Sequence, residues 1–238
     1  MANRFRYPTG ARPLLIEETA RRRRIESRFV SLLEDAGFAE VVLPIIDFAE
    51  PYAEVMPRDT AKQSYRFTDR DGELVAIRSD FTPMVARALA PSLNGNLPLR
   101  VYYRGDVIRC EATRLGSNRE LFQIGAEIVG DGSPDADLEM LQLAAAIAAQ
   151  FSAEPLVVYT DAPELEDPRF VRHDEEDARG YYTGVRFWVY GDDRRRPIAQ
   201  GGRYDALYGR FGVEAPAIGF TFTVDDLAER RLPASRSA

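Results

Sequence analysis

The sequence predicts an α+β fold in which helices pack against one antiparallel sheet. Short apolar segments of strand type outnumber the helical ones. Two alternating segments, 64–68 and 73–78, flank Asp71-Gly72, which is a strong signal for a hairpin. Strands and helices do not alternate in the strand–helix–strand order typical of a parallel sheet, and no internal repeat is visible.

Composition restricts the classes of function. The chain has 238 residues, 45% hydrophobic and 29% charged, as in ordinary globular proteins. A net charge of −7 argues against a general nucleic-acid-binding protein. The single cysteine, Cys110, excludes an intramolecular disulfide and a cysteine-based zinc site. Any histidine-based mechanism would depend entirely on the single histidine, His173. We expect no metal and no cofactor. No apolar run is long enough to span a membrane and no signal peptide is visible, so a cytoplasmic location is expected.

The first third predicts a helix and a strand interrupted by proline. Residues 13–36 show apolar residues at helical spacing, with Pro13 in the first turn and Gly37 as the stop signal. Residues 41–46 form a short apolar strand that contains Pro44. Proline inside a strand indicates a sheet edge or an interface.

Four consecutive arginines, Arg21–Arg24, lie within the first helix. They could contact RNA or phosphate. Four consecutive residues cover the whole circumference of a helix, however, so a solvated helix surface is the favoured interpretation.

The middle of the chain predicts two helices and three strands. Thr82 and Pro83 open a helix that ends at Leu89, with threonine as its N-cap. A second helix follows the cap Ser133. The three strands and the second helix cover residues 98–105, 107–112, 120–129 and 134–150.

The last third predicts more strands around a polar connection. Residues 161–179 are acidic, without periodicity, and are expected to form a surface connection. Gly201-Gly202 is expected to open a helix at 203–211. Strands are predicted at 155–160, 184–190, 197–200 and 216–222, the last followed by a short helix.

Several polar residues fall on strand positions that share a face. Arg109 and Glu111 lie on one side of their strand, and Gln123, Gly125 and Glu127 lie on one side of the next. Polar groups on a core-facing surface need partners or a ligand, and glycine leaves room for a ligand. An exposed polar sheet face explains the pattern equally well.

Two further segments could contribute to a ligand site. Asp80 ends a strand just before Thr82, so it could hold an ammonium group or simply cap the helix. Tyr181 and Tyr182 offer a flat apolar wall with hydroxyl groups, which suits an aromatic ligand.

Taken in order, these segments resemble the catalytic core of class II aminoacyl-tRNA synthetases, and of histidyl-tRNA synthetase in particular. The Pro44 strand resembles the dimer-forming motif 1, Arg109 to Glu127 resembles motif 2, and Ala217 to Phe220 resembles motif 3. The match extends over residues 10–228. The resemblance implies a dimer interface at Pro44 and a histidine site formed by Asp80, Thr82, Arg109, Gln123, Glu127, Tyr181 and Tyr182.

The chain departs from the synthetase pattern at three places. Asp226 stands where motif 3 carries an arginine that binds ATP phosphates, and Asp177 matches a second catalytic arginine unless Arg179 replaces it. By this comparison we expect the helical insertion to be reduced to 161–179 and no anticodon-binding domain to follow motif 3. A single core domain spanning 1–238 is therefore expected, without catalytic residues and without tRNA as a partner.

With these losses, the chain resembles a paralogue of the synthetase, the regulatory subunit of ATP phosphoribosyltransferase. That resemblance implies a non-catalytic subunit of histidine biosynthesis, which forms a dimer and assembles with a short-form catalytic subunit. It also implies a part in feedback by free histidine. The alternative is an enzyme that still adenylates an amino acid, which Asp226 argues against.

Overall fold

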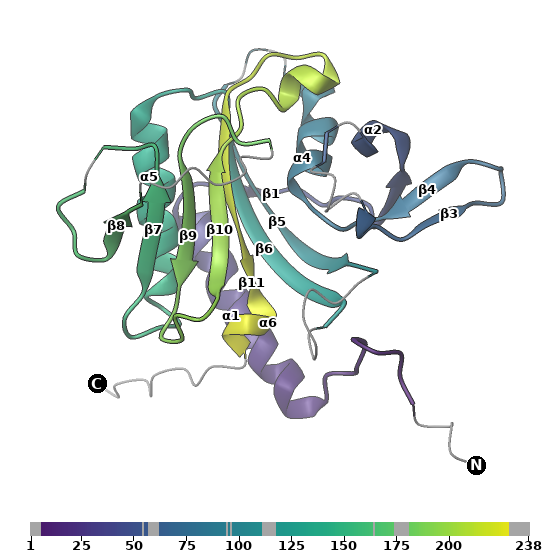
Figure 1. Ribbon diagram of the computed structural model, residues 1–238, viewed down its shortest axis with the longest axis horizontal. Helices are drawn as coiled ribbons and strands as arrows, with labels where there is room; N and C mark the ends of the chain where they lie inside the picture. Colours follow the sequence, from purple (N-terminus) through teal and green to yellow (C-terminus); the bar gives the residue numbers. More distant parts are fainter. Residues whose placement is uncertain are drawn as a thin grey trace.

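The computed structural model describes residues 6–53, 55–56, 62–93, 95, 97–110, 118–163, 165–173 and 181–228. Its centre is an eight-stranded twisted sheet (Figure 1). The strands, in spatial order, are β1 (Ala39–Glu40), β5 (Leu99–Ile108), β6 (Glu120–Val129), β11 (Ala217–Thr223), β10 (Pro197–Arg203), β9 (Arg186–Tyr190), β7 (Leu156–Thr160) and β8 (Phe170–Arg172). The six central strands are antiparallel, as predicted, whereas β1 and β8 pair in parallel at the two edges.

A three-stranded sheet projects from the side of this body (Figure 1). It consists of β2 (Ile46–Phe48), β4 (Leu74–Ile77) and β3 (Arg66–Thr68), with the short helix α2 (Glu50–Ala53) beside it. The β3–β4 hairpin confirms the prediction made from Asp71-Gly72. Gly72 has φ +88°, and the carboxylate of Asp69 accepts hydrogen bonds from the turn.

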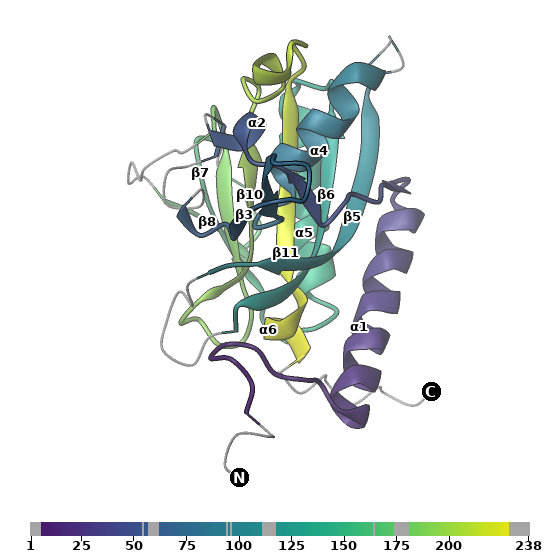
Figure 2. The ribbon, with the colours of Figure 1, turned by 90° about the vertical axis from the view of Figure 1, so that its right-hand side faces the viewer.

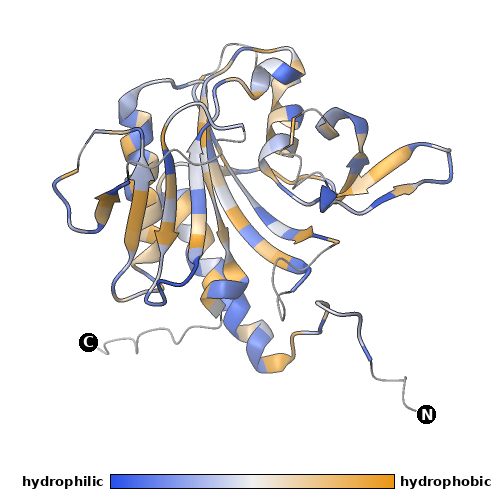
Figure 3. Cartoon of the chain, in the orientation of Figure 1, coloured by the Kyte–Doolittle hydropathy of each residue, from blue (hydrophilic) through white to orange (hydrophobic). Residues whose placement is uncertain are grey.

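Helices cover both faces of the main sheet (Figure 2). On one face lie α1 (Ile16–Asp35), α5 (Pro134–Ala148) and α6 (Val224–Ala228), which enclose the largest apolar core. On the other face α4 (Thr82–Leu89), continued by η1 (Ala90–Ser92), packs with Phe81 and Val85 against Val101 and Tyr103. Hydrophobic residues follow the central strands and the β3–β4 hairpin (Figure 3). None of the helices in the described ranges is long and apolar enough to cross a membrane.

The helix starts are only partly as predicted. Ser133 caps α5, because its Oγ accepts a hydrogen bond from the backbone N–H of Ala136 at 3.3 Å. Helix α4 has the predicted bounds, but Thr82 is its first helical residue rather than its cap. The Asp80 carboxylate accepts the N–H of Thr82 instead, which leaves the Thr82 hydroxyl free to donate to another residue.

Two predicted strand boundaries are wrong. Residues 41–45 form no strand, because the side chain of Arg78 donates to the carbonyls of Leu43 and Pro44 and takes the place of a strand partner. The strands predicted at 98–105 and 107–112 are one strand, β5. It continues through Gly105, whose φ of +149° permits a bend without a break.

The C-terminal third also differs from the prediction. The connection at 161–179 contains the edge strand β8. Gly201 and Gly202 lie inside β10 and open no helix. A Cβ at either position would lie within 2.5 Å of a backbone carbonyl, so only glycine fits there. Only η2 (Tyr208–Phe211), a single 3₁₀ turn, occupies the predicted helix.

Candidate functional site

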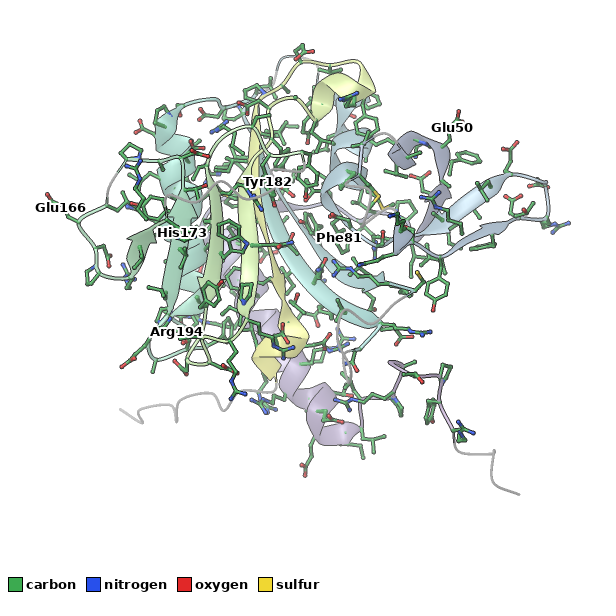
Figure 4. All side chains as sticks on the ribbon, in the orientation of Figure 1. Glu50, Phe81, Glu166, His173, Tyr182 and Arg194 are labelled. Carbon is green, nitrogen blue, oxygen red and sulfur yellow. The ribbon has the colours of Figure 1, made fainter. Side chains whose placement is uncertain are left out.

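A cavity lies on the sheet face that carries α4. Strands β6, β10 and β11 form its floor, and the start of α4 and the segment before β9 form its sides. It is lined by Asp80, Thr82, Arg109, Gln123, Tyr181, Tyr182, Gln200, Gly201, Tyr204, Gly219, Phe220 and Thr221. Six of the seven predicted histidine-binding residues therefore lie around one cavity. Figure 4 shows Tyr182 over the middle of the sheet and Phe81 at the base of α4.

The seventh predicted residue, Glu127, lies directly beneath the cavity. Its side chain is 1% exposed and accepts hydrogen bonds from the hydroxyls of Thr82 and Tyr103, both at 3.2 Å, and from that of Tyr204. Burial raises the pKa of Glu127 to about 8, although the three hydroxyl donors act in the opposite direction. An acid with this pKa is mainly protonated at neutral pH. A cationic ligand close to it would favour its ionised form.

Asp80 is the second acid of the site. Burial raises its pKa, and the nearby guanidinium of Arg109 partly offsets that increase. One Asp80 oxygen is used by the N–H of Thr82, at 3.1 Å. Helix capping and ligand binding are therefore compatible at Asp80, since a carboxylate has a second oxygen to offer.

Tyrosine rings form one wall of the cavity. The ring centroids of Tyr181 and Tyr182 are 4.8 Å apart, and Tyr204 meets Tyr181 edge to face at 5.9 Å. The guanidinium of Arg186 lies 5.1 Å from the Tyr182 ring and 4.8 Å from the Trp188 ring. This stacking supports the outer side of the wall, as expected for cation–π contacts.

Glycines in the floor make room for the acid. A Cβ at Gly219 would lie 1.3 Å from Oε2 of Glu127. A Cβ at Gly125 would lie 2.3 Å from the Tyr103 hydroxyl and 2.6 Å from the carbonyl of Phe220. The expectation that Gly125 leaves room for a ligand is wrong, because the Tyr103 hydroxyl and the Phe220 carbonyl fill that space.

The cavity is narrow. Its volume is about 20 Å³, which is room for roughly one water molecule. A ligand of amino-acid size would therefore bind only if the side chains that line the cavity moved apart.

Two functional residues were missed from the sequence. Tyr103 faces the cavity from β5, and the alternation of that strand placed it on the same side as Arg109. Tyr204 follows Gly201-Gly202, a pair too common in turns to indicate a site. The tertiary structure brings both hydroxyls to Glu127, one from β5 and the other from the segment after β10.

Among the positions that depart from the synthetase pattern, the structure describes Asp226, which is not part of the cavity lining. Asp226, at the start of α6, forms an ion pair with Arg196 at 2.6 Å. Its neighbour Asp225 pairs with Arg22 and accepts the N–H of Phe122 at 2.7 Å. The acid at the motif 3 position thus serves a structural contact. Glu111, Asp177 and Arg179 fall outside the described residues.

Comparisons with known proteins support the resemblance. A family model described as histidyl-tRNA synthetase matches residues 10–165 and 164–227. The ATP phosphoribosyltransferase regulatory subunit of Geobacter sulfurreducens is 37% identical, over 91% of this chain and 71% of that protein. The corresponding protein of Geobacter metallireducens is 38% identical, but the match covers only 59% of this chain and 33% of that protein. Histidine–tRNA ligase of Methanocaldococcus jannaschii is 28% identical, over 93% of this chain and 74% of that protein.

Solved structures agree on the fold. A structure described as an ATP phosphoribosyltransferase regulatory subunit/histidyl-tRNA synthetase from Bacillus halodurans C matches with a TM-score of 0.82 at 22% identity, over 96% of this chain and 84% of that one. A histidine–tRNA ligase subunit from Alicyclobacillus acidocaldarius matches with a TM-score of 0.79, also at 22% identity, over 96% of this chain and 97% of that one. With the family match and the sheet just described, the chain belongs to the histidyl-tRNA synthetase family, which also includes ATP phosphoribosyltransferase regulatory subunits.

Proposed function

We propose that this protein is a regulatory subunit of ATP phosphoribosyltransferase in histidine biosynthesis, and that it binds free histidine without catalysing a reaction. One observation carries the proposal. One acid, an arginine and a tyrosine wall line the cavity and a second acid, Glu127, lies beneath it, while the acid at the motif 3 position is paired with Arg196 outside it. The names of the relatives support the same role.

The chemistry of the cavity fits histidine. Asp80, with Thr82 and Gln123 nearby, suits the α-ammonium group, and the Arg109 guanidinium suits the carboxylate. Tyr181 and Tyr182 would hold the imidazole ring, with Glu127 accepting its N–H from below. Each of the ligand's polar groups thus has a partner, which burial of polar groups requires.

The narrowness of the cavity supplies a mechanism for regulation. Histidine would bind only to a form in which the lining side chains have moved apart. A ligand that binds one form more tightly shifts the equilibrium toward that form. The shift would then be transmitted to the partner by coupling between the two binding events.

Charge argues against adenylation by this chain. A carboxylate about 4 Å from a phosphate would repel it by roughly 4 kcal/mol at an effective dielectric constant near 20. At the motif 3 position the acid Asp226 would replace attraction by repulsion. We therefore propose that catalysis resides in a short-form catalytic subunit, and that tRNA is not a partner.

A dimer interface at Pro44 is part of the proposal. Pro44 is exposed, and six large apolar side chains near it in the sequence or on the adjoining three-stranded sheet are also exposed. They are Val42, Ile45, Ile46, Phe48, Phe67 and Leu74. Several exposed apolar side chains in one region are typical of a protein interface.

Calorimetry with histidine tests the ligand. Glu127→Ala removes a hydrogen bond to a charged or polar ligand group and should weaken binding by about 10- to 100-fold. Glu120→Ala, an exposed glutamate on the same strand, is the matched control and should bind as the wild type does. No heat with histidine, either alone or with the catalytic subunit, would contradict the sensor role.

Two assays test the function. Co-expression with a short-form catalytic subunit should give one complex on size-exclusion chromatography, with transferase activity that histidine lowers. ATP–pyrophosphate exchange with a panel of amino acids should stay at background. Robust exchange would instead show an adenylating enzyme.

A further inference from the structure

Two arginine-rich segments lie at the same end of the molecule. The first is α1, on which residues 21, 24 and 28 share one side of the helix. The second is the turn between β9 and β10. We call the following six residues the arginine face: Arg21, Arg24, Arg28, Arg194, Arg195 and Arg196. Figure 4 places Arg194 at the end of the sheet where Figure 1 shows α6 and the N-terminal part of α1.

Contacts through α6 and α5 join the two segments. Asp225 of α6 pairs with Arg22 of α1, and the adjacent Asp226 pairs with Arg196 of the turn, at 2.6 Å. Arg28 donates to Gln150 at the end of α5, at 3.0 Å. Two residues farther on, the Ser152 hydroxyl donates to Asp192 at the start of the same turn, at 2.5 Å.

Two acids of the turn, Asp192 and Asp193, are engaged within the protein. Asp192 accepts the backbone N–H groups of Ala153 and Glu154, and Asp193 pairs with Arg195 at 3.2 Å. Within the described ranges, Arg24 and Arg194 are exposed and form no ion pair. Two guanidinium groups of the arginine face are therefore available to a partner, on a chain whose net charge is −7.

Resting on the function proposed above, we propose that the arginine face docks onto an acidic surface of the phosphoribosyltransferase catalytic subunit. The planar guanidinium group binds carboxylates through two hydrogen bonds, and arginine is enriched at protein interfaces. A protein partner fits better than nucleic acid, since the acidic chain as a whole would repel a long polyanion while a local patch can match a complementary one.

The position of the arginine face suits a regulatory subunit. On β6, Gln123 lies at the cavity and Glu127 beneath it, whereas Ile124 and Ala126 belong to the core that α1 covers. Docking on the α1 side would therefore leave the cavity open to its ligand. Strand β11 lines the cavity and continues directly into α6, whose acids hold Arg22 and Arg196. Cavity and arginine face are thus joined by one continuous segment.

The test compares two double variants with the same change in charge. Arg24→Glu/Arg194→Glu reverses two exposed charges of the arginine face. Arg172→Glu/Arg210→Glu reverses two exposed arginines elsewhere, one on β8 and one on η2. Circular dichroism and the thermal midpoint check that both variants fold.

Binding of the catalytic subunit is measured by calorimetry at several salt concentrations. The arginine-face variant should raise Kd by about tenfold or more at low salt and weaken its salt dependence, while the control stays within about twofold of the wild type. Equal affinity of all three proteins would overturn the docking surface but leave the proposed function intact. Failure of the wild type to bind would overturn both. Loss of binding to a short single-stranded RNA, with the protein complex unaffected, would assign the face to nucleic acid instead.

Discussion

At the scale of single residues, the site depends on how three hydroxyl groups hold one buried acid. Thr82, Tyr103 and Tyr204 all donate to Glu127, and they come from α4, β5 and the segment after β10. Burial nevertheless raises the pKa of Glu127 to about 8. The folded protein therefore holds a proton there that the unfolded chain, with an ordinary pKa near 4.3, has released at neutral pH.

Glu127 should make stability depend on pH. Its pKa is higher in the folded protein, so its stabilising contribution is complete below the unfolded pKa and is lost as the pH rises toward about 8. The thermal midpoint of the wild type should fall between pH 5 and pH 8. In Glu127→Gln, which keeps the shape and one acceptor oxygen, the fall should be smaller.

The raised pKa of Asp80 acts in the same direction, so some dependence should remain in that variant. Glu120→Gln, an exposed change on the same strand, should follow the wild type. Differential scanning calorimetry of the wild type and both variants measures how the thermal midpoint changes with pH. The same slope in wild type and Glu127→Gln would contradict the assignment of a buried proton to Glu127.

At the scale of elements, the close approach of β6 and β11 forms the cavity floor. Gly125 of β6 is paired with Thr221 of β11 and lies against Tyr103 and the Phe220 carbonyl. The sequence predicted both strands from their apolar alternation, and it predicted that Gly125 leaves room. It did not predict which side chain would use that room, because this depends on the pairing of β5, β6 and β11.

Gly125→Ala should destabilise the protein by about 2 kcal/mol or more, because a methyl group there meets backbone as well as side chain. It should also abolish histidine binding by displacing Tyr103. Gly132→Ala is the matched control, since its nearest contact would be an ordinary 3.4 Å from Pro216. Urea unfolding measures the free energy of unfolding of both variants. A Gly125→Ala variant as stable as the control would show that the strands can separate easily.

At the scale of the whole molecule, two surfaces point to assembly. The apolar surface around Pro44 and the three-stranded sheet is the proposed dimer contact, and the arginine face is the proposed partner contact. They belong to different parts of the fold, the projecting hairpin sheet and the end of the main sheet near α6 (Figure 1). Both contacts could therefore be made at the same time.

If the proposed dimer forms through this surface, Ile46→Glu should convert it into a monomer, because the variant places a charge in a contact that must be desolvated. Ile46 is 46% exposed on β2, and Val171 is 47% exposed on the edge strand β8, so Val171→Glu is the matched control. Analytical ultracentrifugation should give a monomer for the first variant and a dimer for the second. A dimer for both would exclude this surface.

The sequence by itself determined the α+β class and most of the elements, and its resemblance to a known family named six of the residues that line the cavity. Local signals sufficed for the elements: alternation for the strands, Ser133 for the start of α5, and Asp71-Gly72 for the hairpin. Tertiary structure decided the rest. It removed the strand at 41–45 because Arg78 occupies the backbone acceptors, and it placed Gly201-Gly202 inside β10 because that segment pairs with β9 and β11 on its two sides. It also paired Asp226 with Arg196 and brought Tyr103 and Tyr204 to Glu127. Contacts between distant segments have no local signature, because they depend on how strands pair and not on the order of residues along the chain.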